Sequence, residues 1–338
     1  MNLWSLLAGF VPVVAFLLGL RVMDSYKLVH RRTLIATLAG GVTAAALAFV
    51  ANRALLDAVH VPPDVLRAWW APLLEEALKA ALLVWLVQSE RVGFVVDAAV
   101  LGFAAGTGFA LAENVYYAGA LRDASLPLWL VRGLGTAIMH GSTTALFALL
   151  GKALSDRWEK LGLLAFAPGL LVAIAVHAAY NQLDASPLLK TAALLVAMPL
   201  LLMAAFEYSE RATRDWLSSG FDGELEMLES ILDDAVAQTA VGRYLDALRS
   251  RFEPIVVADL FCLLTIHLEL SLRAKGQLMA RAHGIELPVD ESLRANLEEM
   301  KYLEKAVGTT GCLAILPLRR QSRRDLWQIL LLERARGD

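Results

Sequence analysis

The chain has 338 residues, of which 57% are hydrophobic, and its mean hydropathy is +0.54. A composition this apolar excludes an ordinary soluble globular protein. The formal net charge of −3 indicates no class of partner, and no run of basic residues is typical of a nucleic-acid surface, so we expect no nucleic-acid partner.

Apolar segments long enough to cross a bilayer fill the first 206 residues. A transmembrane helix needs about 20 predominantly apolar residues. Seven segments meet this length, at 3–20, 34–52, 66–88, 95–118, 128–150, 161–182 and 188–206. They predict an all-α, polytopic transmembrane helix bundle with seven spans.

Basic loop residues indicate how these spans are oriented. The loop after the first span, residues 21–32, contains four Lys or Arg side chains and is expected to face the cytoplasm. Alternation through seven spans then places the N-terminus outside and the C-terminal part in the cytoplasm. The segment 102–106, GFAAG, also places Gly102 and Gly106 four residues apart, which predicts close packing of the fourth span against a neighbour.

Residues 207–338 carry 17 Lys or Arg and 22 Asp or Glu, against 14 and 12 in residues 1–206. Segments 222–238 and 292–307 show apolar residues at helical spacing between mixed charges. We therefore expect a cytoplasmic helical domain of unknown role. The segment 255–271 is apolar enough for an eighth span, but Asp259, His267 and Glu269 favour a buried helix of this soluble domain.

Ionisable side chains interrupt the middle spans. An ionisable group inside the bilayer costs several kcal/mol, so it usually faces the bundle interior and has a partner. The spacing of Glu75 and Lys79 fits a structural ion pair, but one lysine cannot neutralise both Glu75 and Glu76. The other polar residues of interest in these spans are Glu113, His140, His177 and Asn181.

The depths of these residues agree with one another. Under the predicted topology Glu75, Glu113 and His177 each lie about five residues from the outer end of a span, or roughly 8 Å at ~1.5 Å per residue. His140 lies somewhat deeper. We therefore expect one cavity in the outer half of the membrane.

Hydrolysis is the chemistry that this set of side chains suits. A carboxylate in a dry site can act as a general base on water, and histidine or asparagine can hydrogen-bond an oxyanion. Alternatively, Glu113, His140 and His177 could bind zinc, with Glu75 as the base. The residues do not decide between these mechanisms. A transporter or proton relay could use the same buried set, and a membrane-anchored scaffold would leave the set unexplained.

The ordered motifs EEALK (75–79), FALAE (109–113), His140 and HAAYN (177–181) resemble the PrsW family of intramembrane proteases, which is grouped with the CAAX prenyl proteases and bacteriocin-processing enzymes. The resemblance covers roughly residues 65–185. Thr136 stands where the family usually has phenylalanine, which affects a packing position.

The resemblance implies roles for six residues. Glu75 would activate water with help from Glu76, Glu113 and His140 would complete the water or metal site, and His177 with Asn181 would stabilise the oxyanion. The related CAAX proteases are metal-free glutamic enzymes, so we expect no cofactor, with zinc as the alternative.

The resemblance also implies a protease embedded in the lipid bilayer of the bacterial inner membrane. Its expected substrate is a membrane-anchored protein, such as an anti-sigma factor. The oligomeric state stays open.

Overall fold

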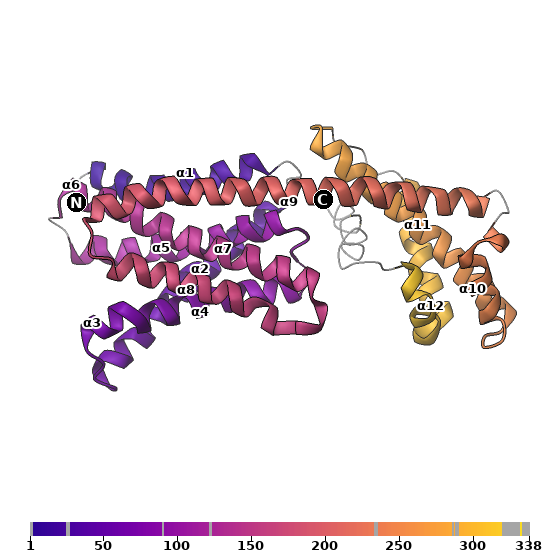
Figure 1. The fold of residues 1–338 in the computed structure, drawn as a ribbon, viewed down its shortest axis with the longest axis horizontal. Helices are drawn as coiled ribbons and strands as arrows, with labels where there is room; N and C mark the ends of the chain where they lie inside the picture. The colour runs from indigo at the N-terminus through magenta and orange to yellow at the C-terminus, as the bar shows by residue number, and fades with distance from the viewer. Residues whose placement is uncertain are drawn as a thin grey trace. The chain divides into compact units, whose positions relative to one another are not determined.

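The computed structural model describes residues 3–24, 28–89, 91–121, 124–232, 236–285, 287, 291–319 and 332. Every element within these residues is helical, which confirms the predicted all-α class. The chain divides into two compact units, Met1–Glu210 and Arg211–Asp338 (Figure 1). The domain boundary predicted at residue 206 falls inside one long helix, α9 (Pro187–Leu232).

The first unit contains all the predicted spans. Its elements are α1 (Leu3–Met23), α2 (Arg31–Asp57), α3 (Pro63–Val65), the π-helix η1 (Leu66–Trp70), α4 (Ala71–Gln88), α5 (Val95–Ala120), α6 (Leu126–Leu130), the π-helix η2 (Val131–Thr136), α7 (Ala137–Arg157), the 3-10 segment η3 (Glu159–Phe166), α8 (Ala167–Gln182) and the first part of α9. Lys27, part of the basic loop used to orient the spans, lies outside the described residues.

Seven described helices are long and apolar enough to cross a membrane, but they are not the seven that the sequence predicts. The set includes α11 (Pro254–Ala282) and omits α4, which is 18 residues long and contains Glu75, Glu76 and Lys79. Helix α4 nevertheless packs against α2, α7 and α8 inside the bundle. Its charges are therefore buried among apolar helices.

Helix α5 is the centre of the first unit, and nearly all of its first 16 residues are buried. It packs most extensively against α7 and α2, and Figure 1 shows α5 and α7 running through the middle of this unit. A Cβ atom at Gly106 would collide with the backbone carbonyl of His140, and one at Gly108 would collide with that of Leu38. Gly102 meets Thr144 and Ala145 in the same way, so the predicted close packing at Gly102 and Gly106 is confirmed.

The second unit contains η4 (Val236–Gln238), α10 (Ala240–Leu248), α11 and α12 (Glu291–Arg319). Helix α11 packs against α12, and its leucines form the centre of the hydrophobic core of this unit. Glu269 accepts a hydrogen bond from Asn296 of α12 at 2.8 Å. This packing favours a core helix over an eighth span, because α12 is amphipathic and carries charged residues between its buried positions. Residues 233–235, 286, 288–290, 320–331 and 333–338 of this part lie outside the described residues.

Close helix packing at Gly106 can be tested by adding a single methyl group. We expect Gly106→Ala to lower the free energy of unfolding by about 1–3 kcal/mol, because the added Cβ overlaps the His140 carbonyl. Gly119→Ala in the same helix is the matched control, since an added Cβ there meets no atom within 4 Å. Thermal unfolding in detergent measures both. Equal melting temperatures for the two variants would contradict the packing.

Candidate active site

Two π-helical segments lead into the helices that carry the candidate residues. η1 directly precedes α4 with Glu75 and Glu76, and η2 directly precedes α7 with His140. Single π-helical turns are rare and are found frequently at functional sites. These turns could not be predicted from the sequence, because both segments lie within apolar stretches that are also long enough for a regular helix.

A buried ion pair lies at the centre of the site. Lys79 Nζ is 2.6 Å from Glu76 Oε1, and the two side chains are 0% and 1% exposed. His177 Nδ1 lies 2.9 Å from the same oxygen, which also accepts a hydrogen bond from Thr143 at 3.3 Å. Three donors on one carboxylate oxygen offset part of the cost of burying the charge.

Lys79 also fixes the orientation of His140. Its Nζ lies 3.2 Å from His140 Nδ1, and an ammonium group can only donate. The hydrogen of a neutral His140 ring is therefore on Nε2, which lies 3.3 Å from Glu113 Oε2. The His140 ring packs edge-on to the ring of His177, with centroids 4.8 Å apart.

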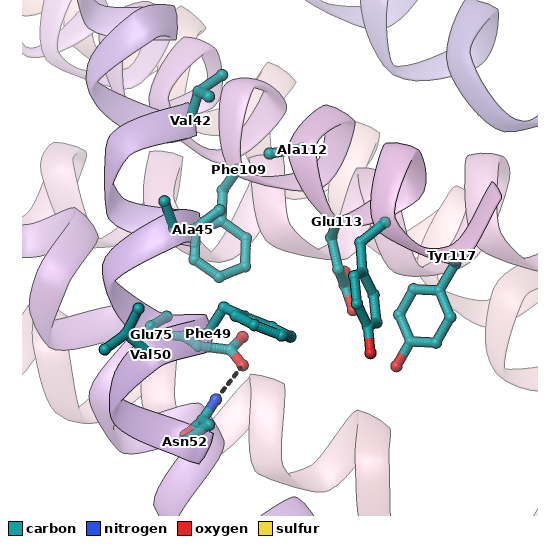
Figure 2. A pocket seen from close by; sticks show the side chains of 13 residues that line it. Val42, Ala45, Phe49, Val50, Asn52, Glu75, Phe109, Ala112, Glu113 and Tyr117 are labelled. Carbon is teal, nitrogen blue, oxygen red and sulfur yellow. Dashed lines mark hydrogen bonds between the residues drawn. The ribbon is translucent and has the colours of Figure 1, made fainter. Parts of the chain in front are cut away.

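The two remaining glutamates line a pocket beside this buried cluster. Glu75 is 15% exposed, accepts a hydrogen bond from Asn52 at 3.4 Å, and has Oε2 3.9 Å from His177 Nε2. Glu113 Oε2 lies 3.4 Å from an Arg132 guanidinium nitrogen. Figure 2 shows Glu75 on the side of the pocket near Asn52, and Glu113 on the other side, near Tyr117.

His177 has one nitrogen directed at each carboxylate of the adjacent pair. Because the Glu76 carboxylate can only accept, Nδ1 of His177 donates to it and a neutral ring has its lone pair on Nε2. A separation of 3.9 Å between Nε2 and Glu75 Oε2 is too long for a direct hydrogen bond. This separation suits a water molecule or an ion that contacts both atoms.

The structure brings Glu75, Glu76, Glu113, His140 and His177 together, and their catalytic roles stay predictions. The structure groups two sets of side chains differently from the sequence interpretation. The partner of Lys79 is Glu76 rather than Glu75, because the three-residue spacing brings the charges to 2.6 Å.

The predicted zinc ligands also differ from those that the structure groups together. The group whose ligand atoms lie within 4.8 Å of one another contains Glu75, His140 and His177, whereas the prediction had Glu113 in place of Glu75. Glu113 instead faces Arg132 and His140 from α5.

Asn181 lies one turn beyond His177, but its amide donates to the backbone carbonyl of Arg67 in η1 at 3.1 Å. Its neighbour Gln182 donates to the carbonyl of Ala68 at 2.9 Å. Both amides therefore attach the end of α8 to the π-helical segment before α4. The predicted oxyanion role of Asn181 stays a prediction.

Three residues that contact this set were not singled out from the sequence. They are Asn52, Arg132 and Thr143. Asn52 and Arg132 lie near the ends of predicted spans, where polar residues are common. Arg132 is also held by Asn114, which accepts from its Nε at 2.8 Å, and packs over the ring of Tyr117. Arg132 could have been singled out from the sequence, because it is a charged residue inside the predicted span 128–150.

The donor set fits a catalytic zinc ion in kind and spacing. Two histidines and one carboxylate are a common set of three zinc ligands, and His177 has the carboxylate partner that zinc-bound histidines usually have. The hydrogen bond from Lys79 to His140 Nδ1 acts against this use, because it leaves Nε2 protonated. Zinc binding would therefore require this contact to change.

A protein-family model matches the part of the chain that contains these residues. The family model described as PrsW family intramembrane metalloprotease matches residues 29–205, which is 177 of 338 residues and extends from α2 into the first part of α9. No curated protein and no solved structure matches the chain.

The Lys79–Glu76 pair should stabilise the fold only as a pair. We expect Lys79→Met to lower the free energy of unfolding by roughly 3–5 kcal/mol, because it leaves the buried Glu76 charge unpaired. The double variant with Glu76→Gln should lose less than the sum of the two single variants. Arg53→Met, in the exposed pair with Asp57, is the control and should change stability by less than about 1 kcal/mol. Additive losses in the detergent unfolding assay would contradict the coupling.

Proposed function

Since the chain belongs to the PrsW family of intramembrane proteases, we propose that it hydrolyses a peptide bond of a membrane-anchored protein with water activated by Glu75. The observation that supports this proposal is that the adjacent residues Glu75 and Glu76 have different surroundings. Glu76 is buried and occupied by three donors, whereas Glu75 faces the pocket with one donor, Asn52.

Glu75 is placed to take a proton from water. A water molecule between Glu75 Oε2 and His177 Nε2 would lose its proton to Glu75 while its oxygen forms a bond to the substrate carbonyl carbon. The proton then passes from Glu75 to the leaving amine as the C–N bond breaks. This returns Glu75 to the carboxylate and releases the two peptide fragments.

The developing oxyanion needs hydrogen-bond donors. The N–H at Nε2 of His140, which lies 3.3 Å from Glu113 Oε2, would be one donor after turning from that carboxylate. His177 would supply a second only with both ring nitrogens protonated, because Nε2 of its neutral ring has the lone pair. Asn181 would contribute only by leaving the Arg67 carbonyl. Glu76 and Lys79 act through the histidines, by fixing the orientation of both rings.

Glutamic catalysis without a metal is the version that the hydrogen bonds favour, because the Lys79 contact at Nδ1 places the hydrogen of a neutral His140 ring on Nε2. If zinc is bound, Glu75, His140 and His177 would hold it, and the ion would supply acidification of a bound water. A proton relay is the rival function. The set lies towards one end of α4, α5 and α8, whereas a relay needs a path to both membrane faces.

The protein is integral to a membrane, and we propose the bacterial inner membrane with the N-terminus outside and the second unit in the cytoplasm. The site then opens towards the outer half of the bilayer. A single-span protein whose cleavage starts outside the cytoplasm, such as an anti-sigma factor, is the proposed substrate class.

Loss of Glu75 or His177 should abolish cleavage of co-reconstituted single-span proteins. We expect Glu75→Gln to reduce the cleavage rate by roughly 10²–10⁴-fold, because an amide cannot accept the proton of water. His177→Ala should have a comparable effect. Asp57→Asn, at an exposed ion pair of α2, is the control and should cleave at the wild-type rate. Cleavage that survives both site substitutions would sink the assignment.

The proposed orientation can be measured separately. A reporter enzyme that folds only outside the cytoplasm should be inactive when fused after the last residue, and a reporter that fluoresces in the cytoplasm should be bright. The opposite pattern would invert the topology and move the site to the cytoplasmic side.

A further inference from the structure

The apolar pocket beside Glu75 and Glu113 has not yet been assigned a ligand. Its volume is about 460 Å³, which lies in the range of roughly 300–1,000 Å³ that is typical of small-molecule sites. α2 and α5 form most of its wall, and α4 contributes Glu75. Figure 2 shows the labelled apolar side chains of α2 and α5 around the space that the two glutamates border.

Small side chains give this pocket its volume and aromatic side chains border it. The alanines of the lining include Ala45, Ala46 and Ala112. Phe49 and Tyr116 pack against each other with ring centroids 5.0 Å apart. Both are about half exposed, at 49% and 53%, and in a membrane-spanning bundle an exposed aromatic face meets lipid. The pocket therefore borders both the bilayer and the candidate base.

Polar groups gather on the side of the lining where the chemistry would occur. Glu75 accepts from Asn52, and Glu113 Oε2 lies 3.3 Å from His140 Nε2 and 3.4 Å from an Arg132 guanidinium nitrogen. A lipid chain in this pocket would leave both carboxylates facing hydrocarbon, which is costly. A peptide supplies an apolar side chain for the alanine-lined wall and N–H groups for the carboxylates.

We infer that the pocket formed by Ala45, Ala46, Phe49, Ala112 and Tyr116 is the specificity pocket of this protein, and that it accepts a large apolar side chain next to the scissile bond of a membrane-embedded substrate segment. The inference rests on the proposed function, since it takes Glu75 as the base. It names leucine-like or phenylalanine-like side chains as the preferred class, presented by a chain that reaches the site from the bilayer.

Substrate preference tests the pocket. The probes are single-span reporters that differ only in one residue, Ala, Leu or Phe, placed at successive positions near the outer membrane boundary. Mass spectrometry of the product termini identifies the position next to the cleaved bond. There the wild-type protein should cleave the Leu and Phe reporters at least about ten-fold faster than the Ala reporter.

Filling the pocket should remove this preference. Ala45→Phe and Ala46→Phe, which differ in burial so that one variant can replace the other if folding fails, should lower the Leu-to-Ala cleavage ratio about ten-fold. Ala36→Phe is the matched control, because Ala36 is exposed on the same helix and lies outside the pocket lining. An unchanged ratio in both pocket variants at the wild-type melting temperature would overturn the inference.

Crosslinking gives a second readout that needs no activity. A photoreactive phenylalanine analogue at position 49, in a Glu75→Gln background, should form an adduct with the membrane segment of the Leu reporter. The same analogue at the exposed Leu47, which is not in the lining, should not. Adducts with lipid alone at position 49 would overturn the inference. Reporter adducts without cleavage by the wild type would instead contradict the proposed proteolysis and leave the pocket assigned.

Discussion

The buried ion pair between Lys79 and Glu76 is the interaction on which the rest of the site depends. Two charges with almost no exposure lie on a helix surrounded by apolar helices, where an unpaired charge would cost several kcal/mol. Each of the two charged groups also contacts a histidine. Glu76 also holds His177, and Lys79 also holds His140, so neutralising this pair orients the two imidazole rings.

The orientation of the two rings gives Glu75 and Glu76 different surroundings. Glu76 is committed to the interior, which leaves Glu75, the next residue along α4, to face the pocket. The arrangement also requires α7 to approach α5 closely, since His140 must reach Glu113. Glycine at position 106 permits this, because a side chain there would strike the His140 backbone. The close packing of α5 against α7 is therefore also what brings His140 within reach of Glu113.

Much of this could be predicted from the sequence, because ionisable residues within apolar segments stand out. The class of fold and the meeting of Glu75, Glu113, His140 and His177 followed from span length and shared depth. The partner of Lys79 did not, since residues three and four positions apart on a helix both lie within reach.

Other features depend on packing that the sequence does not display. Asn52 and Arg132 could be assigned to the site only because α2 and η2 bring them beside the glutamates. The choice between span and core helix for α11 also needed its contacts with α12, because length and hydropathy fit both.

We propose that Glu75 activates water without a metal ion. In this proposal the positive charge buried in the site is the ammonium group of Lys79, which contacts Glu76 and His140. The most direct measurement determines metal content and cleavage rate on the same purified, reconstituted sample before and after chelation. The account predicts that protein with far less than one metal ion per chain cleaves at an unchanged rate. A rate that falls with metal content and returns when zinc is added would contradict it.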